Sequence, residues 1–212
     1  MQHTTGQEQS SSSHDLTDKV ILITGAAHRL GAQMARTLHE AGAQLILHYR
    51  SSRDAAHQLQ QELNALREDS VVLIQADLHD TSKLVPIIKD AVSVWNRLDA
   101  LVNNASGFYP TSVGEITEED WDDLIGSNLK APLFLSQAAA PHLAKRQGCI
   151  VNIVDIHAER PLKNYPLYSI AKAGLVMLTK SLACELGPEV RVNAVAPGAI
   201  LWPEHDFDEV TK

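Results

Sequence analysis

The chain has 212 residues, enough for one domain with a full hydrophobic core, and its 44% hydrophobic and 21% charged residues are typical of a soluble globular protein. Its 26 acidic and 18 basic residues give a net charge of −8, which argues against a nucleic-acid binder but is compatible with a local basic pocket for a phosphorylated cofactor. No apolar stretch approaches the roughly 20 residues that a membrane span requires, so we expect no membrane partner.

The start of the chain and its cysteines add little chemistry. Residues 1–17 are polar and have no apolar signal-peptide core, so we expect a disordered tail ahead of one domain over residues 18–212. Cys149 and Cys184 lie in apolar segments and lack the spacing of metal ligands, so we expect two buried structural thiols and no metal site. Nothing in this cysteine usage indicates an oxidising compartment, and we expect a cytoplasmic protein.

Short apolar runs alternate with longer helical patterns along the chain. The runs are rich in Val, Ile and Leu, which is typical of strands buried on both faces of a parallel sheet, and they lie at 19–24, 44–49, 71–76, 100–104, 149–154 and 190–195. The helical patterns between them lie at 30–41, 53–67, 81–95, 117–145 and 165–186. This alternation predicts right-handed βαβ units and a single α/β domain with a Rossmann-type doubly wound parallel sheet.

The segment between the first strand and the first helix, TGAAHRLG at positions 24–31, has the context of a nucleotide-binding turn. Gly25 allows the tight turn, Gly31 allows the helix to pack closely on the strand, and the helix N-terminus attracts a pyrophosphate. Arg29 stands where such turns usually have their middle glycine, so a close backbone contact is replaced by a guanidinium that can bind phosphate oxygens. The alternatives are an ordinary strand-to-helix connection and a solvated surface arginine.

The end of the second predicted strand bears on the choice of dinucleotide. NAD sites usually have an Asp or Glu here for the ribose 2′-hydroxyl, whereas this chain has no carboxylate before Asp54. The residues in its place are His48, Tyr49, Arg50, Ser51, Ser52 and Arg53. Because arginine and serine bind a 2′-phosphate and a carboxylate would repel it, the sequence favours NADP(H) over NAD(H).

Two questions stay open at this edge of the predicted site. A polar loop without a ligand is the alternative reading of the strand end, and either Arg50 or Arg53 could face the 2′-phosphate. Asp77, after the third predicted strand, could accept a hydrogen bond from the adenine amino group or could cap the next helix.

Tyr168 and Lys172 are four residues apart in a helical pattern and therefore share one face of the helix. A tyrosine has a reference pKa of about 10, and a neighbouring ammonium lowers this pKa by stabilising the phenolate. Such a pair suits proton transfer coupled to hydride transfer, although the same spacing is common on surface helices.

Five segments in order, TGAAHRLG, LVNNAS, NLKAP, YSIAK and RVNAVAPGAI, resemble the motifs of the short-chain dehydrogenase/reductase family. The match runs from about residue 18 to residue 201. The resemblance implies that Tyr168 is the general acid/base, that Lys172 lowers its pKa and holds the nicotinamide ribose, and that Asn128 completes a proton relay through water.

The same resemblance bears on assembly and on the C-terminus. It implies a homotetramer formed through the helices at 117–145 and 165–186, although core burial explains their alanine-rich patterns equally well. Family members usually continue well beyond the pair Pro197 and Gly198, so we expect the C-terminal part of the domain to be short or missing.

Departures from the family pattern indicate a subgroup. Asp155 stands where the family normally has a serine before the tyrosine, which argues against a plain ketone or alcohol and suits reduction of a C=N bond. Arg29, the strand end LHYRSS, the segment NNASGFYPT and Asp155 together resemble pteridine reductases. This resemblance implies that Arg29 contacts the cofactor phosphate and the pterin, that Phe108 stacks on the pterin opposite the nicotinamide, and that Ser106 hydrogen-bonds the pterin or the cofactor. Loop packing is the alternative for Phe108.

The expected site combines catalytic, substrate and cofactor residues. The expected catalytic residues are Asp155, Tyr168, Lys172 and Asn128, and the expected substrate-binding residues are Arg29, Ser106, Phe108, Asp155 and Tyr168. The expected NADP(H)-binding residues are Gly25, His28, Arg29, Leu30, His48, Tyr49, Arg50, Ser51, Asp77, Leu78, Asn104, Ala105, Ser106, Tyr168, Lys172, Pro197 and Gly198.

The expected reaction is the NADPH-dependent reduction of a dihydropterin to a tetrahydropterin, with oxidised pterins and dihydrofolate as additional substrates. Hydride passes from the nicotinamide to a pterin ring carbon, while Tyr168, Asp155 and Lys172 manage the proton. The alternatives are a short-chain reductase of another carbonyl or imine and a non-catalytic NADP-binding protein.

Overall fold

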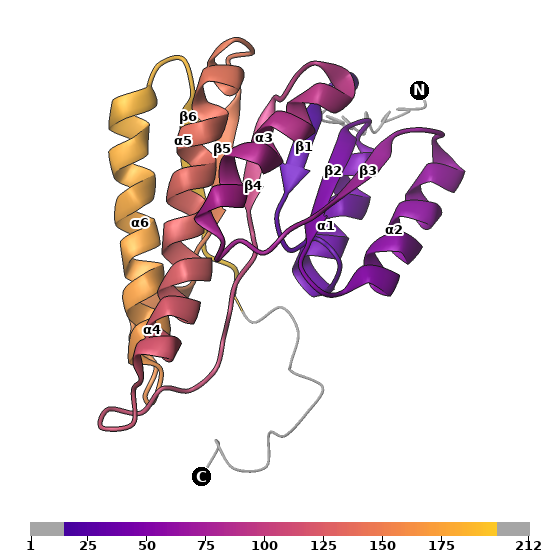
Figure 1. Cartoon of the computed structure of the whole chain (residues 1–212). Helices are drawn as coiled ribbons and strands as arrows, with labels where there is room; N and C mark the ends of the chain where they lie inside the picture. The colour runs from indigo at the N-terminus through magenta and orange to yellow at the C-terminus, as the bar shows by residue number, and fades with distance from the viewer. Residues whose placement is uncertain (1–14, 199–212) are drawn as a thin grey trace, which may run out of the picture.

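The computed structural model describes residues 15–198, in which strands and helices alternate along the chain (Figure 1). The strands are β1 Val20–Ile23, β2 Gln44–Tyr49, β3 Val71–Gln75, β4 Ala100–Asn103, β5 Cys149–Ile153 and β6 Arg191–Val195. Every pairing between them is parallel, and the strand order is β3-β2-β1-β4-β5-β6. The predicted α/β domain with a Rossmann-type doubly wound sheet is confirmed.

The helices agree with the predicted ranges, with one interruption. They are α1 Arg29–Glu40, α2 Arg53–Leu66, α3 Thr81–Trp95, α4 Glu118–Ile125, α5 Ala131–Ala144 and α6 Pro166–Leu186. The single helix predicted at 117–145 is divided between α4 and α5 by a π-helical turn, Gly126–Lys130. Such turns widen the helix locally and often occur at functional sites, and this one contains Asn128.

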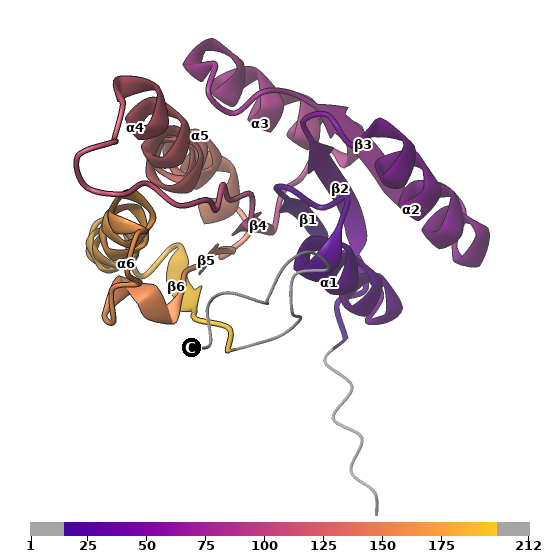
Figure 2. The same cartoon turned by 90° about the horizontal axis from the view of Figure 1, so that it is seen from below.

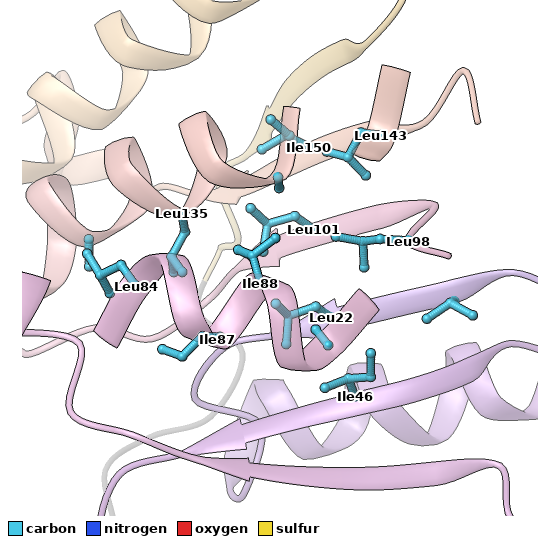
Figure 3. Packing of buried hydrophobic residues seen from close by; sticks show 14 of the residues in the cluster. Leu22, Ile46, Leu84, Ile87, Ile88, Leu98, Leu101, Leu135, Leu143 and Ile150 are labelled. Atoms are coloured by element: carbon cyan, nitrogen blue, oxygen red, sulfur yellow. The ribbon is translucent and has the colours of Figure 1, made fainter. Parts of the chain in front are cut away.

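Helices cover both faces of the sheet (Figures 1 and 2). α1 and α2 pack on one face, whereas α3, α5 and the last turns of α6 pack on the other. Figure 3 shows the second of these cores, where Leu84 and Ile88 of α3 meet Leu135 of α5 above Leu22 of β1. Each of these side chains is almost fully buried and contributes about 1.5–3 kcal/mol through the hydrophobic effect, so the strand ends are held in fixed relative positions.

The strand β6 departs from the predicted burial. The Val-rich run at 190–195 predicts a strand buried on both faces, but within β6 only Val192 is buried and Val195 is 51% exposed. β6 lies at one end of the strand order, and in the described part of the chain no strand pairs with its outer edge. Its composition therefore reflects the preference of β-branched residues for strands rather than burial.

The expectation of two buried thiols is wrong for Cys184, which is exposed near the end of α6, whereas Cys149 is half-buried in β5. By length and composition alone, α6 is apolar enough to cross a membrane, contrary to the expectation from the sequence. It packs against β6 and the neighbouring helices, and its buried residues include Leu167, Ala171 and Leu175, while Leu182, Ala183 and Leu186 pack against the core.

The boundaries of the domain are described only in part. Leu16, predicted to be part of a disordered tail, donates its N–H to the carbonyl oxygen of Ala41 at 2.8 Å and packs against the α1 side of the core. The rest of the predicted tail, residues 1–14, and the predicted short C-terminal part after Gly198 lie outside the described residues.

Candidate active site

A cleft of about 420 Å³ lies at the carboxyl end of the sheet, where β1 and β4 are neighbours although they are far apart in the sequence. Doubly wound sheets bind their ligands at this switch point. The cleft is lined by these predicted cofactor residues: Gly25, His28, Arg29, Leu30, His48, Tyr49, Arg50, Ser51, Asp77, Leu78, Asn104, Ala105 and Ser106. The predicted residues Tyr168, Lys172, Pro197 and Gly198 do not line it.

The turn between β1 and α1 leaves no space for side chains at its two glycines. Gly25 has a φ of +61°, and a Cβ there would lie 2.8 Å from the Cα of Ala105. A Cβ at Gly31 would lie 2.4 Å from the carbonyl oxygen of Gly25 and 2.8 Å from Nδ2 of Asn104. The close approach of helix, turn and β4 loop therefore depends on these two residues, as the sequence predicts for Gly31.

Arg29 has the left-handed backbone conformation that a glycine usually supplies, with a φ of 48°. This conformation costs about 1–2 kcal/mol for a residue with a Cβ. The side chain is exposed and lines the cleft, and within residues 15–198 its guanidinium makes no hydrogen bond or ion pair. A strained backbone that presents a free cation to a cleft is typical of a ligand-binding position.

His48 lies beneath the turn and is almost fully buried, with 2% of its surface exposed. Its Nδ1 accepts the N–H of Gly25 at 3.3 Å, and its Nε2 donates to the carbonyl oxygen of Ala76 at 3.1 Å, which requires the neutral ring. Burial lowers the pKa of His48 to about 4, so the ring stays neutral at physiological pH. Although His48 borders the cleft, both its nitrogens are occupied, and its role is to hold the turn rather than to bind a phosphate.

The strand end after β2 distinguishes the two candidate arginines. Arg50, Ser51 and Ser52 line the cleft, whereas Arg53, the first residue of α2, does not. No carboxylate from this strand end lines the cleft, because Asp54 belongs to α2. Of the two candidate arginines, Arg50 is therefore the one that lines the cleft.

Asp77 does not cap the next helix, because the N-cap of α3 is Asp80, which accepts the N–H of Ser82. Instead, Oδ1 of Asp77 accepts the main-chain N–H of His79 at 3.0 Å and lies 2.7 Å from Nδ1 of the same residue. These hydrogen bonds from His79 hold the pKa of Asp77 below its usual value, so the carboxylate is ionised and able to accept further bonds. The helix-cap alternative for Asp77 is thereby excluded.

Asn128 is fully buried and ties the π turn to the loop that follows β4. Its Oδ1 accepts the hydroxyl of Ser106 at 2.6 Å, and its Nδ2 donates to the carbonyl oxygens of Gly107 at 3.1 Å and Leu124 at 2.9 Å. The amide thus bonds to protein partners and positions the loop, and its part in a proton relay through water stays a prediction. The Ser106 oxygen keeps lone pairs for a ligand.

Asp155, Tyr168 and Lys172 meet beyond the end of β5. The Tyr168 hydroxyl donates to Oδ2 of Asp155 at 2.7 Å, and the other carboxylate oxygen accepts the N–H of His157 at 2.9 Å. Lys172 is buried, donates from Nζ to the carbonyl oxygen of Ile153 at 2.9 Å, and lies 5.6 Å from the centre of the Tyr168 ring. The sequence-based triad is therefore assembled by the fold.

The protonation of this triad differs from the sequence-based expectation. Burial, together with the hydrogen bond to Asp155 and its negative charge, raises the pKa of Tyr168 above its usual value. The expected lowering by Lys172 does not dominate, because burial and the adjacent Asp155 carboxylate, which accepts the phenol hydrogen bond, both disfavour the phenolate. Burial lowers the pKa of Lys172 to about 8, so this amine can exchange a proton near neutral pH.

Phe108 packs against two tyrosines at the mouth of the triad. Its ring stacks on Tyr165 with centroids 4.7 Å apart and meets Tyr168 edge-to-face at 4.8 Å. The ring remains 52% exposed, so it has loop packing on one side and a free aromatic surface on the other. Sequence reasoning did not identify Tyr165, because nothing in a linear pattern shows that it faces Phe108.

Several further residues line the cleft without having been predicted as site residues, namely Ala27, Gly31, Ser52, His79, Gly107, Asp123 and Ser127. Most of them adjoin a predicted residue in the sequence, and adjacency was the available signal. His79 and Asp123 are the charged or titratable members of this set, and the fold brings them together across 44 positions. Within residues 15–198, no group of three or more His, Cys, Asp or Glu side chains could hold a metal ion.

Comparison with known proteins places these features in context. The family model described as short chain dehydrogenase matches residues 19–206. A relative named Pteridine reductase 1, from Leishmania tarentolae, is 39% identical over 227 aligned residues, which cover 89% of this chain and 78% of the relative. A 3-oxoacyl-(acyl-carrier-protein) reductase FabG from Staphylococcus aureus is 36% identical over 185 residues, covering 86% and 75%. A Probable galactose dehydrogenase GalD from Rhizobium meliloti is 34% identical over 194 residues, covering 91% and 75%.

Proposed function

This chain belongs to the short-chain dehydrogenase family, and we propose that within this family it is an NADPH-dependent pteridine reductase. The observation that carries the proposal is the 2.7 Å hydrogen bond from the Tyr168 hydroxyl to the Asp155 carboxylate. A serine in place of Asp155 would offer a hydroxyl to a substrate carbonyl, whereas a carboxylate beside a phenol can relay a proton to a ring nitrogen. The similarity to Pteridine reductase 1 supports the same assignment.

The residues around the cleft fit a phosphorylated dinucleotide. At Gly25 and Gly31, neighbouring atoms occupy the space that a Cβ would need, as in dinucleotide turns. The N-terminus of α1 adds the positive end of its dipole. Arg29 would bind the pyrophosphate, Arg50 and Ser51 would bind the 2′-phosphate, and the ionised Asp77 would accept the adenine amino group. When bound, NADPH supplies the hydride. This donor set favours NADP(H) over NAD(H) because cations and hydroxyls replace the usual carboxylate.

Side chains of this protein supply the proton that the substrate takes up. The phenol of Tyr168 is protonated at neutral pH and donates its proton to Asp155, so the pair would deliver a proton to a substrate nitrogen. Asp155, fixed through its second oxygen by the N–H of His157, holds the hydroxyl in one direction. Lys172, with a pKa of about 8, restores the proton and would hold the nicotinamide ribose. Asn128 contributes by fixing the loop that carries Ser106.

The substrate surface suits a flat heteroaromatic ring. The free side of Phe108 would stack on one face of a pterin, Ser106 would hydrogen-bond its edge, and Arg29 would interact with both pterin and phosphate. We propose a dihydropterin as substrate and a tetrahydropterin as product, with oxidised pterins and dihydrofolate as further substrates. Aromatic stacking contributes about 0.5–1.5 kcal/mol beyond the burial of apolar area, so Phe108 is a useful probe of pterin stacking.

We further propose that the enzyme is a cytoplasmic homotetramer. Apolar side chains on α4, α5 and α6 remain well exposed in the single chain, among them Trp121 at 47%, Ile170 at 50% and Met177 at 60%. Burying them between copies would remove apolar surface from water. Light scattering of the purified protein measures the assembly, and a monomer at micromolar concentration would contradict it.

A substrate panel tests the proposed function. The purified chain is assayed by the loss of NADPH absorbance with dihydrobiopterin, dihydromonapterin, dihydrofolate, an acetoacetyl thioester and a simple ketone, and by NAD(P)H formation with galactose. We expect the dihydropterins to give the highest kcat/KM and the Tyr168→Phe variant to lose activity by a factor of at least about 100. Turnover of ketones or thioesters without turnover of any pterin would contradict the proposal.

The second candidate function is a short-chain reductase of another carbonyl or imine. It is favoured by the similarity at 36% to the 3-oxoacyl reductase, which is close to the 39% found for the pteridine reductase. The Asp155→Ser variant separates the two functions, because a hydroxyl there suits a carbonyl. Retained or improved ketone reduction in this variant would favour the second function, whereas loss of pterin reduction would favour the first.

A further inference from the structure

His79 connects two parts of the cleft that are distant in the sequence. It lies in the loop between β3 and α3, and its side chain is 27% exposed. On one side its Nδ1 lies 2.7 Å from Oδ1 of Asp77. On the other side its Nε2 lies 3.1 Å from the main-chain oxygen of Asp123 and 3.2 Å from Oδ1 of the same residue, which belongs to α4.

Both ring nitrogens of His79 face oxygen atoms that can only accept. The Asp77 carboxylate lies against Nδ1, and the carboxylate and main-chain oxygens of Asp123 lie against Nε2. The ring therefore joins the loop that carries Asp77 to α4, which carries Asp123.

The π turn is shaped to receive this ring. Gly126 begins the turn, and a Cβ there would lie 2.8 Å from Cδ2 of His79. A larger residue would displace the imidazole from its contacts with Asp123, because the three atoms nearest to such a Cβ all belong to the His79 ring. The glycine at this position thus serves the contact between the β3–α3 loop and α4.

Contacts of His79 connect Asp77 at one end of the cleft with the π turn at the other. His79 uses Oδ1 of Asp77 twice, through its main-chain N–H and its ring, and no bond among the described residues uses Oδ2. At its other end, His79 rests on the π turn that carries Asn128, whose amide holds the loop of Ser106. One side chain therefore sets the adenine end of the cleft relative to the corner next to the triad.

We propose that His79 is a positioning residue for the dinucleotide: it fixes the Asp77 carboxylate and fastens the β3–α3 loop to α4, so that both ends of the cleft are preformed. This inference rests on the proposed cofactor. It assigns a role to a residue that needs no contact with the reacting atoms, and it predicts an effect on cofactor affinity rather than on the chemical step.

The test uses the full chain and compares His79→Ala with His142→Ala, a histidine in the last turn of α5 that does not line the cleft. Calorimetry measures the Kd of NADP⁺ and of 2′-AMP, and kinetics with NADPH and a dihydropterin give KM and kcat. Because the contacts of the ring with Asp77 and Asp123 are lost, we expect about a tenfold rise in Kd and KM in the His79 variant, with kcat within about twofold of the parent. His142→Ala leaves all four values unchanged.

Two further variants keep the inference open to refutation if His79→Ala folds poorly. Gly126→Ala retains the histidine but displaces its ring, and we expect it to weaken NADP⁺ binding as His79→Ala does. His79→Gln, which can donate to one of the two carboxylates, is expected to give an intermediate Kd. Unchanged Kd values in correctly folded His79→Ala and Gly126→Ala would overturn the inference, as would a loss confined to kcat.

The binding measurement contains no pterin, so the two proposals can fail separately. A parent chain that binds NADP⁺ but reduces no pterin would contradict the proposed substrate, while the effect of His79→Ala on Kd still decides the role of His79. A parent chain that binds no NADP⁺ would overturn both the cofactor assignment and this inference.

Discussion

The strained backbone at Arg29 allows its binding role to be separated from its structural cost. The residue has a φ of 48°, and a side chain in this region costs about 1–2 kcal/mol relative to glycine. Glycine loses about 0.5–1 kcal/mol more conformational entropy on folding, which offsets part of that gain. We therefore expect Arg29→Gly to raise the free energy of unfolding by up to about 1 kcal/mol, which corresponds to about 2–4 °C in melting temperature for a domain of this size.

The guanidinium has no protein partner among the described residues, so its removal leaves no unpaired group behind. A charge-assisted bond to phosphate contributes about 1.5–3 kcal/mol, so both Arg29→Gly and Arg29→Ala should raise the Kd of NADP⁺ by about tenfold to 100-fold. Arg29→Ala retains the strain and is the matched control for stability. The assays are thermal unfolding followed by circular dichroism and titration calorimetry with NADP⁺.

The melting temperature and the NADP⁺ affinity of the Arg29 variants test two separate statements, the strain of the backbone and the reach of the guanidinium. A glycine variant that unfolds at a lower temperature than the alanine variant would show that the left-handed conformation is not strained. Unchanged NADP⁺ affinity in both variants would show that the guanidinium does not reach the phosphates. A stabilised variant with weakened binding is the expected combination.

Three other substitutions test neighbouring parts of the site. Gly31→Ala places a Cβ 2.4 Å from the Gly25 carbonyl oxygen, so we expect a loss of NADP⁺ affinity of more than about tenfold and a lower melting temperature, with normal affinity as the contradictory result. His48→Ala leaves the N–H of Gly25 and the carbonyl of Ala76 unpaired, which should cost about 2–4 kcal/mol in urea unfolding at pH 7. In the parent, the stability contributed by neutral His48 is complete above pH 6.5 and is lost as the pH falls toward 4. The difference in unfolding free energy between the parent and His48→Ala should therefore shrink over this range, and a constant difference would contradict the assignment. Lys172→Met should abolish turnover and remove the rise in unfolding free energy that the parent shows between pH 8 and 10.5, because the pKa of Lys172 falls from 10.5 to about 8 on folding; a variant that keeps this rise would refute the assignment.

The fold and the outline of the cleft can be predicted from local patterns, because strand burial and helix periodicity depend on residues that are close together in the sequence. The turn at Gly25, the strand end at Arg50 and the position of Asp77 all lie next to predicted strand ends, so a parallel sheet necessarily gathers them at one edge. The pairing of His79 with Asp123 depends on tertiary packing across 44 positions, and no local pattern encodes it. The sequence therefore located the cleft better than it described the interactions inside it.

The protonation of Tyr168 shows the same limit more sharply. From the sequence, the lysine four residues on predicts a lowered phenol pKa, since spacing on a helix is readable from the chain. In the fold, Lys172 donates to the Ile153 carbonyl while Asp155 takes the phenol hydrogen bond, and both burial and the carboxylate act in the opposite direction. Which neighbour dominates is decided by the path of β5, which is a property of the tertiary structure.

The hydrogen bond between Tyr168 and Asp155 bears on which substrates the site can protonate. The phenol donates its one proton to Oδ2 of Asp155 at 2.7 Å, so a proton passes to a substrate through this carboxylate or after this bond is broken. Burial and the negative charge of Asp155 raise the pKa of Tyr168, which makes the phenol a weaker acid than a free tyrosine. A weak acid needs a basic acceptor, and a ring nitrogen is more basic than a carbonyl oxygen. Under the proposed function, the pair of Asp155 and Tyr168 therefore suits a C=N substrate better than a C=O substrate.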